Sequence, residues 1–271
     1  MTEISEMFAD LKTKNEGALI GYVTVGDPNL TKSSRLIMAL AEGGADLMEL
    51  GIPFSDPIAD GPTIQGAVVR SLSNGCKPLD VIEIAQEVHE NHDIPLVVMT
   101  YYNPIFRIGL EKFLQPARKA GISGLIVPDL PVEESQTYRD KCRANDLDTI
   151  FLASPSTDER RLKMIAAQTS GYLYLISLYG VTGVRSNIAP EALSLVRQCK
   201  MWLANSLPFA AGFGISKPQH VSRIIRAGAD GVIVGSAFVR IIETDGHNLG
   251  SASRRLRRLA QSLKRATRNK K

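Results

Sequence analysis

Residues 45–65 read Ala45-Asp46-Leu47-Met48-Glu49-Leu50-Gly51-Ile52-Pro53-Phe54-Ser55-Asp56-Pro57-Ile58-Ala59-Asp60-Gly61-Pro62-Thr63-Ile64-Gln65. A short apolar run ends around Glu49, and a loop punctuated by glycine and proline carries Asp60 eleven residues later. An apolar run that leads into such a loop is typical of a β-strand followed by a turn. A carboxylate at the end of that strand either caps a neighbouring group or takes part in chemistry.

The same strand-and-loop pattern recurs along the chain. Many of the runs are continuously apolar, as at residues 96–99, which is expected of parallel strands covered on both faces. Helical patterns lie between the runs, for example at residues 79–89, 110–120 and 221–227. Eight strand–helix units in about 250 residues predict an α/β fold, a (β/α)8 TIM barrel, rather than an open sheet. The predicted strands are residues 18–24, 46–50, 96–101, 124–128, 148–153, 172–177, 208–212 and 231–235.

Length and composition fit one such barrel. The chain has 271 residues and is predicted to be a single domain over 1–271, with an extra helix at residues 2–14 covering the bottom of the barrel. No run approaches the roughly 18 apolar residues of a membrane helix, and the acidic N-terminus does not resemble an export signal. Cys76, Cys142 and Cys199 are widely spaced and odd in number, which predicts reduced thiols in a cytoplasmic protein and no metal site.

The net charge of +4 is unevenly distributed. Residues 254–271 contain nine basic residues and no acidic one, which leaves 23 basic against 28 acidic residues, or −5, for the rest of the chain. The spacing of Leu256, Leu259 and Leu263 predicts a final helix with an apolar face on the core and a solvated charged face. The alternative is an arm that binds nucleic acid or a membrane surface. The segment has no aromatic residues to stack on bases, so neither partner is expected.

Three glycine-rich segments, residues 180–183, 212–214 and 235–236, follow the last three predicted strands. In a TIM barrel the active site lies on the loops after the strands, and the last of these loops frequently bind phosphate through backbone amides and a helix N-terminus. Glycine lets the backbone approach an anion closely, and Ser236 adds a hydroxyl donor. The alternative is that these glycines only cap strands and turns. Their three consecutive positions favour a phosphate site.

At residues 49–65 the chain resembles the signature of the tryptophan synthase α chain family. The resemblance covers about residues 18–240, some four-fifths of the chain. It implies a (β/α)8 barrel that cleaves indole-3-glycerol phosphate to indole and glyceraldehyde 3-phosphate without a cofactor of its own. It also implies a β-chain partner, which carries pyridoxal phosphate and receives the indole, in a hetero-oligomer expected to be α2β2. The other segments that resemble the family are residues 21–28, 101–104, 128–131, 180–183, 212–215 and 235–236.

Two carboxyl groups suit the chemistry that this resemblance implies. To release a substituent from indole C3, C3 must gain a proton, the hydroxyl at C3′ must lose one, and the indole N–H needs an acceptor as positive charge develops. Glu49, at a strand end among apolar neighbours, is predicted to have a raised pKa and to act first as acid and then as base. Asp60, in a more solvated loop, is predicted to stay ionised and to accept from the indole N–H.

The resemblance also assigns further residues to the substrate site. Thr182 is placed on a mobile loop that closes over the site. Tyr22 and Tyr174 could instead be ordinary core residues with satisfied hydroxyls. The predicted substrate-binding residues are Tyr22, Tyr174, Thr182, Gly183, Gly212, Phe213, Gly214, Gly235 and Ser236.

Two positions depart from the family pattern. Bacterial members usually carry phenylalanine where this chain has Tyr22, and arginine followed by a small residue where it has Leu178-Tyr179. The second pair lies in the lid loop, so lid closure is expected to differ. The glycines and Thr182 are retained, which favours the activity itself.

Alternative functions follow from the same residues. In an α chain, Asp56 and Pro57 are expected to contact the β chain, whereas a stand-alone indole-3-glycerol-phosphate lyase would perform the same chemistry without that partner. A non-catalytic regulatory barrel is disfavoured by the presence of both Glu49 and Asp60. A nucleic-acid-binding protein acting through residues 254–271 is the least favoured alternative.

Overall fold

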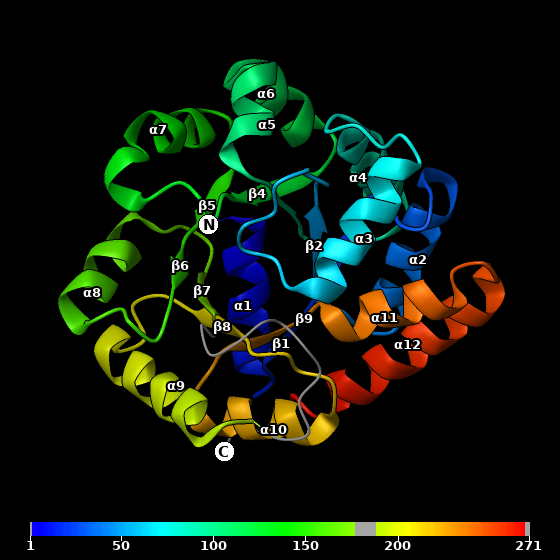
Figure 1. The fold of residues 1–271 in the computed structure, drawn as a ribbon. Helices are drawn as coiled ribbons and strands as arrows, with labels where there is room; N and C mark the ends of the chain where they lie inside the picture. Colours follow the sequence, from blue (N-terminus) through cyan, green and yellow to red (C-terminus); the bar gives the residue numbers. More distant parts are fainter. Residues whose placement is uncertain (1, 177–187, 269–271) are drawn as a thin grey trace.

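The computed structural model describes residues 2–176 and 188–268, which form a nearly closed barrel of parallel strands inside a ring of helices (Figure 1). The named strands pair in the order β5-β4-β3-β2-β1-β9-β8-β7-β6, and all of these pairings are parallel. The strands found in the described residues are β1 (Ala18–Thr24), β2 (Leu47–Gly51), β3 (Leu96–Met99), β4 (Ile122–Ile126), β5 (Asp148–Ile150), β6 (Leu152–Ala153), β7 (Leu173–Ile176), β8 (Phe209–Gly212) and β9 (Gly231–Val234).

A strand is present at each of the eight predicted places, and the ninth arises because one of them is divided. β5 and β6 follow each other with only Phe151 between them, yet β5 pairs with β4 and β6 pairs with β7. The two ends of the pairing order are therefore consecutive parts of one extended stretch. The sheet closes through the backbone at Phe151, which confirms the predicted (β/α)8 TIM barrel.

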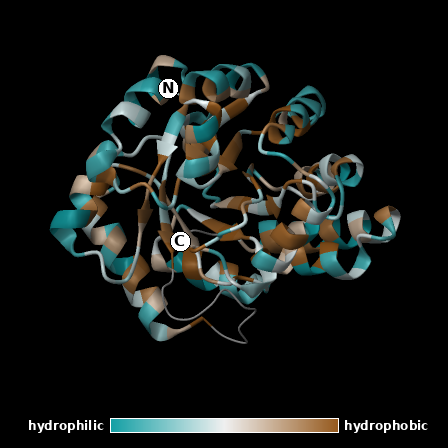
Figure 2. Cartoon of the chain, turned by 45° about the horizontal axis from the view of Figure 1, so that its top comes forward, coloured by the Kyte–Doolittle hydropathy of each residue, from teal (hydrophilic) through white to brown (hydrophobic). Residues whose placement is uncertain are grey.

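Most of the described helices occupy the connections between strands, while one precedes the first strand and two follow the last. The strands at the centre are mainly hydrophobic, and the hydrophilic surface lies mainly on the outer helices (Figure 2). The α-helices of the described residues are α1 (Glu3–Thr13), α2 (Leu30–Glu42), α3 (Pro62–Ser73), α4 (Asp80–Asn91), α5 (Tyr102–Ile108), α6 (Leu110–Lys119), α7 (Gln136–Ala144), α8 (Glu159–Gln168), α9 (Pro190–Leu203), α10 (Pro218–Ala227), α11 (Ser236–Asp245) and α12 (Leu249–Arg265).

Helix α1 closes the N-terminal end of the barrel, as predicted. It begins after Thr2, whose side chain accepts a hydrogen bond from the Ser5 backbone N–H and so caps the helix. Its apolar face, Ile4, Phe8 and Leu11, packs in one cluster with the inward-facing strand residues. In Figure 1 α1 crosses the middle of the ring. Among the described residues, α1 therefore fills the N-terminal end of the barrel. The strand residues of the cluster are Ala18, Ile20, Leu47, Val97, Ile126, Ile150, Ala210 and Ile233, with Tyr172 just before β7.

The basic C-terminal segment forms most of α12, which packs along α2. Leu256 and Leu263 are fully buried, and Lys264 forms ion pairs with Asp46 at 2.9 Å and Glu16 at 3.1 Å. The expected core-packed final helix is therefore confirmed up to its end, while residues 269–271 lie outside the described part.

The remaining sequence expectations concern thiols and membrane spans. The three cysteines are free and buried. Among residues 2–176 and 188–268, no helix is both long enough and apolar enough to cross a membrane.

Candidate active site

A cavity of about 270 Å³ lies at the C-terminal ends of the strands. Most of its wall is apolar, and a few polar groups are set into it. A mostly apolar cleft with a few fixed polar groups is the usual form of a small-molecule site. The lining residues are Tyr22, Ile58, Ala59, Asp60, Ile64, Met99, Leu152, Tyr174, Ile176, Gly212, Gly214, Ile215, Ile233, Gly235 and Ser236.

Glu49 is held inside the barrel beside this cavity. It lies on β2, in register with Tyr22 of β1 and Val97 of β3, and its side chain is completely buried. Its Oε1 accepts a hydrogen bond from the Tyr172 hydroxyl at 2.6 Å, while Oε2 has no hydrogen-bond partner among the described residues. Burial raises the pKa of Glu49 to about 8, although the Tyr172 bond acts in the opposite direction. At neutral pH this carboxyl group is mainly protonated.

Glu49 does not itself line the cavity, but it affects the pKa values of two residues that do. The charge of Glu49 contributes to raising the pKa of Tyr22 and of Tyr174, after the larger effect of their burial. Both tyrosines belong to the cavity wall. The acid therefore lies next to the cavity, and its side chain must turn away from Tyr172 to enter it.

Asp60 lines the cavity directly, from the loop between β2 and α3. Its Oδ2 accepts a hydrogen bond from the Tyr101 hydroxyl at 3.1 Å, and that hydroxyl in turn accepts from the backbone N–H of Ala59 at 2.9 Å. Burial raises the pKa of Asp60 to about 6, opposed by the bond from Tyr101. The side chain is half-buried, so it is more solvated than Glu49 without being fully exposed. Asp60 nevertheless remains the more acidic of the two groups and is mainly ionised at neutral pH.

Two tyrosines explain why several strand ends carry glycine. The ring of Tyr22 lies against Gly51 and Gly235, and a Cβ added to Gly235 would lie 3.2 Å from that ring. A Cβ added to Gly212 would lie 2.8 Å from the ring of Tyr174. These glycines therefore make room for aromatic side chains at the cavity wall, whether or not their backbone also approaches a ligand.

Four of the residues predicted to bind phosphate lie together in the wall of the cavity. Gly212, Gly214, Gly235 and Ser236 all line the cavity, and Gly235 is the N-cap of α11. The first turn of a helix has backbone N–H groups without intrahelical partners and a partial positive charge, both of which favour an anion. This first turn contains no acidic residue to compete for those donors. Phe213 is buried and is not part of the cavity wall.

Some predicted positions lie outside the described residues. These are Thr182, Gly183, the glycine segment at 180–183 and the Leu178-Tyr179 pair. Their proposed roles in the lid and the phosphate site stay predictions. Within the described part, no cluster of three or more histidine, cysteine, aspartate or glutamate side chains could hold a metal ion.

Two further residues of the site, Tyr101 and Tyr172, have no role predicted from the sequence. Tyr172 alternates with Tyr174 along the chain, so their side chains point to the same side, and that spacing is a usable signal. Tyr101 follows a predicted strand, as active-site residues of barrels do. Asp129 accepts from the backbone N–H of Tyr102 at 2.9 and 3.2 Å, which gives it a structural part at the start of α5.

Comparison with known proteins gives a consistent result across almost the entire chain. The family model described as tryptophan synthase alpha chain matches residues 8–268. The tryptophan synthase alpha chain of Methanosarcina mazei is 50% identical over 262 residues, covering 97% of this chain and 93% of that protein. The tryptophan synthase alpha chain of Arabidopsis thaliana is 44% identical over 239 residues, covering 88% and 86%.

Solved structures agree in both fold and sequence. A chain of Mycobacterium tuberculosis tryptophan synthase superposes with a TM-score of 0.89 at 34% identity, over 99% of both chains. A mutant tryptophan synthase alpha-subunit from Pyrococcus furiosus gives a TM-score of 0.84 at 42% identity, over 92% of this chain and 98% of that one. With the barrel and the paired carboxyl groups already in place, this similarity shows that the chain belongs to the tryptophan synthase alpha chain family.

Proposed function

We propose that the chain is a carbon–carbon lyase that cleaves indole-3-glycerol phosphate to indole and glyceraldehyde 3-phosphate. The observation that carries this proposal is the placement of two carboxyl groups at one cavity, with Asp60 in its wall and Glu49 fully buried beside the wall residue Tyr22. Burial raises the pKa of both groups, to about 8 for Glu49 and about 6 for Asp60. Near neutral pH this difference supplies a protonated carboxyl group and an ionised one together. The proton donor for C3, the base for the C3′ hydroxyl and the acceptor for the indole N–H are then all supplied by side chains of this chain.

In the proposed reaction, Glu49 turns from Tyr172 toward the cavity and gives its proton to C3 of the indole ring. The positive charge that develops at the ring nitrogen is stabilised by Asp60, which accepts a hydrogen bond from N1–H. The Glu49 carboxylate then takes the proton of the C3′ hydroxyl. The O–H electron pair forms the aldehyde C=O, the C3–C3′ bond breaks, and its electron pair restores the aromatic ring. Glu49 ends protonated, ready for another cycle.

The phosphate of the substrate is proposed to bind at the opposite end of the cavity. Gly212, Gly214, Gly235 and Ser236 line the cavity after β8 and β9, whereas Asp60 follows β2, and the N-terminus of α11 favours an anion on the glycine side. The apolar residues between this end and Asp60 would cover the faces of the indole ring. The substrate would therefore be bound at both ends, with its scissile bond near Glu49.

A β-chain partner in an α2β2 assembly is the second part of the proposal. Ile58 lines the cavity and is also 82% exposed, and Asp56 beside it is exposed as well. A partner that covered these residues would close over the cavity from which indole leaves. Size-exclusion chromatography with a tryptophan synthase β chain should show a larger complex with higher lyase activity. A chain that neither shifts nor gains activity would be a stand-alone lyase.

The catalytic proposal is tested by measuring indole release from indole-3-glycerol phosphate. We expect near-total loss of kcat for Glu49→Gln and a large loss for Asp60→Asn. Glu87→Gln, the same chemical change on the exposed side of α4, is the matched control and should retain wild-type activity. Full activity in Glu49→Gln would refute the mechanism.

A further inference from the structure

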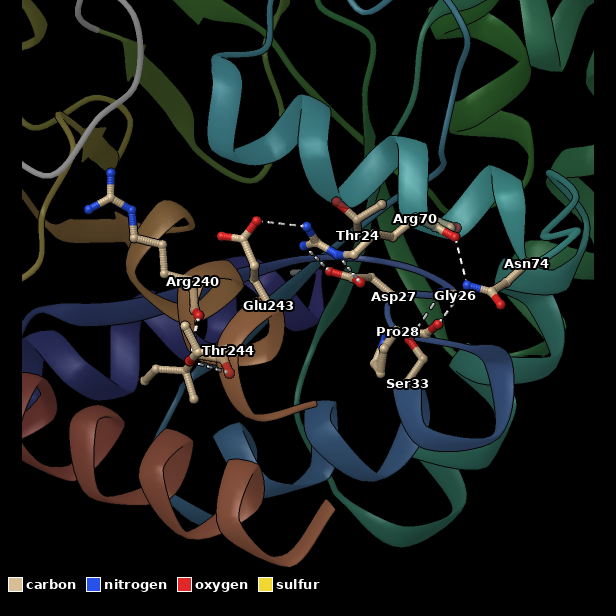
Figure 3. A network of polar contacts seen from close by, with 12 residues as sticks. Thr24, Gly26, Asp27, Pro28, Ser33, Arg70, Asn74, Arg240, Glu243 and Thr244 are labelled. Carbon is tan, nitrogen blue, oxygen red and sulfur yellow. Dashed lines mark hydrogen bonds and ion pairs between the residues drawn. The ribbon is translucent and has the colours of Figure 1, made fainter. Parts of the chain in front are cut away.

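Arg70 connects two acidic residues from different parts of the barrel (Figure 3). Its Nε and Nη2 donate to Oδ1 and Oδ2 of Asp27, both at 2.9 Å, and its Nη1 donates to Oε1 of Glu243 at 3.0 Å. The Asp27 side chain is 1% exposed, whereas that of Glu243 is 52% exposed. A guanidinium that binds one carboxylate with two parallel bonds is fixed in orientation as well as in position.

The elements that Arg70 joins both lead to the cavity. Arg70 lies in the last turn of α3, and α3 begins at Pro62, two residues after Asp60. Glu243 lies on α11, which begins at Ser236 beside Gly235. One arginine therefore links the helix that follows the indole end of the proposed site to the helix that starts at its phosphate end.

Apolar packing between the two helices does not by itself set their register. Val239 of α11 lies in one cluster with Ile64, Ala67 and Val68 of α3, together with Tyr22. These contacts hold the helices together without a preferred direction, and the hydrogen bonds of Arg70 add a directional contact to them. A slide of α11 along α3 would also displace Tyr22, which lines the cavity.

The contact to Asp27 is reinforced independently of Glu243. Ser71 Oγ donates to the Val25 carbonyl at 2.6 Å, and Asn74 Nδ2 donates to the Pro28 carbonyl at 2.8 Å. The end of α3 is thus attached to the loop after β1 by several bonds. Removing the Glu243 carboxylate should therefore remove the directional bond between α11 and α3 while the end of α3 stays attached to this loop and α11 keeps its packing on β1 and α12.

We propose that Arg70 is a positioning residue that sets the distance between Asp60 and the Gly235-Ser236 end of the cavity. The inference rests on the proposed function, in which one substrate occupies both ends. When one molecule binds at two places, its second contact forms readily only if the distance between the two subsites matches the distance between the two binding groups of the molecule. A changed spacing therefore weakens binding of the complete substrate, but not of fragments that touch one end.

The test compares the complete substrate with its two fragments. Glu243→Ala removes the bond to α11, and Arg70→Lys keeps the charge but loses the fork that binds Asp27. For both variants we expect KM for indole-3-glycerol phosphate to rise about 3- to 10-fold and kcat to fall. The inhibition constants of glycerol phosphate, for the phosphate end, and of indole, for the Asp60 end, should stay within roughly twofold of wild type. Glu87→Ala and Arg223→Lys, exposed positions on α4 and α10, are the matched controls.

Results that would overturn this inference can be distinguished from results that would overturn the proposed function. If KM and kcat in both variants equal those of wild type, or if the fragment constants rise in parallel with KM, Arg70 has only a structural role and the proposal is overturned. If Arg70→Lys does not fold, Glu243→Ala, at an exposed position, decides alone. A wild-type protein that releases no indole would instead overturn the proposed function, together with this inference.

Discussion

Glu49→Gln should change how the stability of the protein depends on pH. Glutamine has nearly the shape of a protonated glutamic acid and can still accept the Tyr172 hydrogen bond, but it does not titrate. In the wild type, burial raises the pKa of Glu49 from an ordinary 4.5 to about 8. The folded and unfolded states therefore hold different numbers of protons over a wide range of pH.

The sign and size of the effect follow from that range. Below about pH 4.5 both states keep the Glu49 proton, and the folded state has its full stability with respect to this group. Between pH 4.5 and about 8 only the unfolded chain has released the proton, so stability falls as pH rises. The full slope is about 1.4 kcal/mol per pH unit and falls to half near pH 8, so from pH 5 to 8 the wild type should lose roughly 3 to 4 kcal/mol that the variant keeps.

The assay is urea unfolding followed by circular dichroism at pH 5, 6, 7 and 8, for wild type, Glu49→Gln and the Glu87→Gln control. The amide group that Glu49→Gln introduces is buried where Glu49 Oε2 has no hydrogen-bond partner among the described residues, so it lowers the free energy of unfolding. Because an amide does not titrate, this cost is the same at every pH. The informative quantity is therefore the slope of the stability difference between variant and wild type. Parallel curves for Glu49→Gln and wild type over this range would refute the argument that Glu49 is buried as a neutral acid.

Three further predictions concern other residues at or beside the cavity. Asp60→Asn should lower kcat for indole release by about 100-fold or more, because a neutral amide stabilises the developing charge at the indole nitrogen less well; an unchanged kcat would contradict that role. Tyr172→Phe removes the hydrogen bond that lowers the pKa of Glu49, so the stability loss assigned to Glu49 should continue above pH 8 when the urea series is extended to roughly pH 9 and 10, whereas a profile that levels off as in the wild type would argue against the bond. Gly212→Ala places a methyl group 2.8 Å from the ring of Tyr174, so KM for indole-3-glycerol phosphate should rise about tenfold, and an unaltered KM would show that the ring can move freely.

The strands were predictable because burial on both faces makes their sequences continuously apolar. β1 has the predicted bounds, and β2 differs from the prediction by one residue at each end. The division at Phe151 was not predictable, since it depends on β5 pairing with β4 while β6 pairs with β7. Register between strands is set by contacts across the barrel that no local pattern records. The predicted strand at 96–101 ends instead at Met99, because Tyr101 is already the N-cap of α5.

The two acids were identifiable from one continuous segment, but their hydrogen-bond partners were not. Tyr101 lies 41 residues from Asp60, and Tyr172 lies 123 residues from Glu49. Pairing of β2 with β3 brings Tyr101 near Asp60, whereas Tyr172, just before β7, reaches Glu49 of β2 across the inside of the barrel. The same long-range contacts explain why Asp60 is less solvated than its loop sequence indicates. The bond from Tyr101 holds the side chain at a largely apolar wall, and burial there raises its pKa.

The pKa of Asp60 also bears on which ligands the proposed site accepts. With a pKa of about 6, Asp60 is ionised at physiological pH, but a further rise of about one to two units would make it mainly neutral. Any ligand that covers Asp60 removes more water from it and raises its pKa further, unless the ligand donates a hydrogen bond to the carboxylate. An indole N–H provides that donor, whereas an apolar ring of the same shape leaves a buried carboxylate with only the Tyr101 bond, at a cost of about 1–3 kcal/mol. Partial burial of Asp60 therefore makes the N–H a condition of tight binding, and the group that stabilises charge in the proposed reaction also selects the substrate.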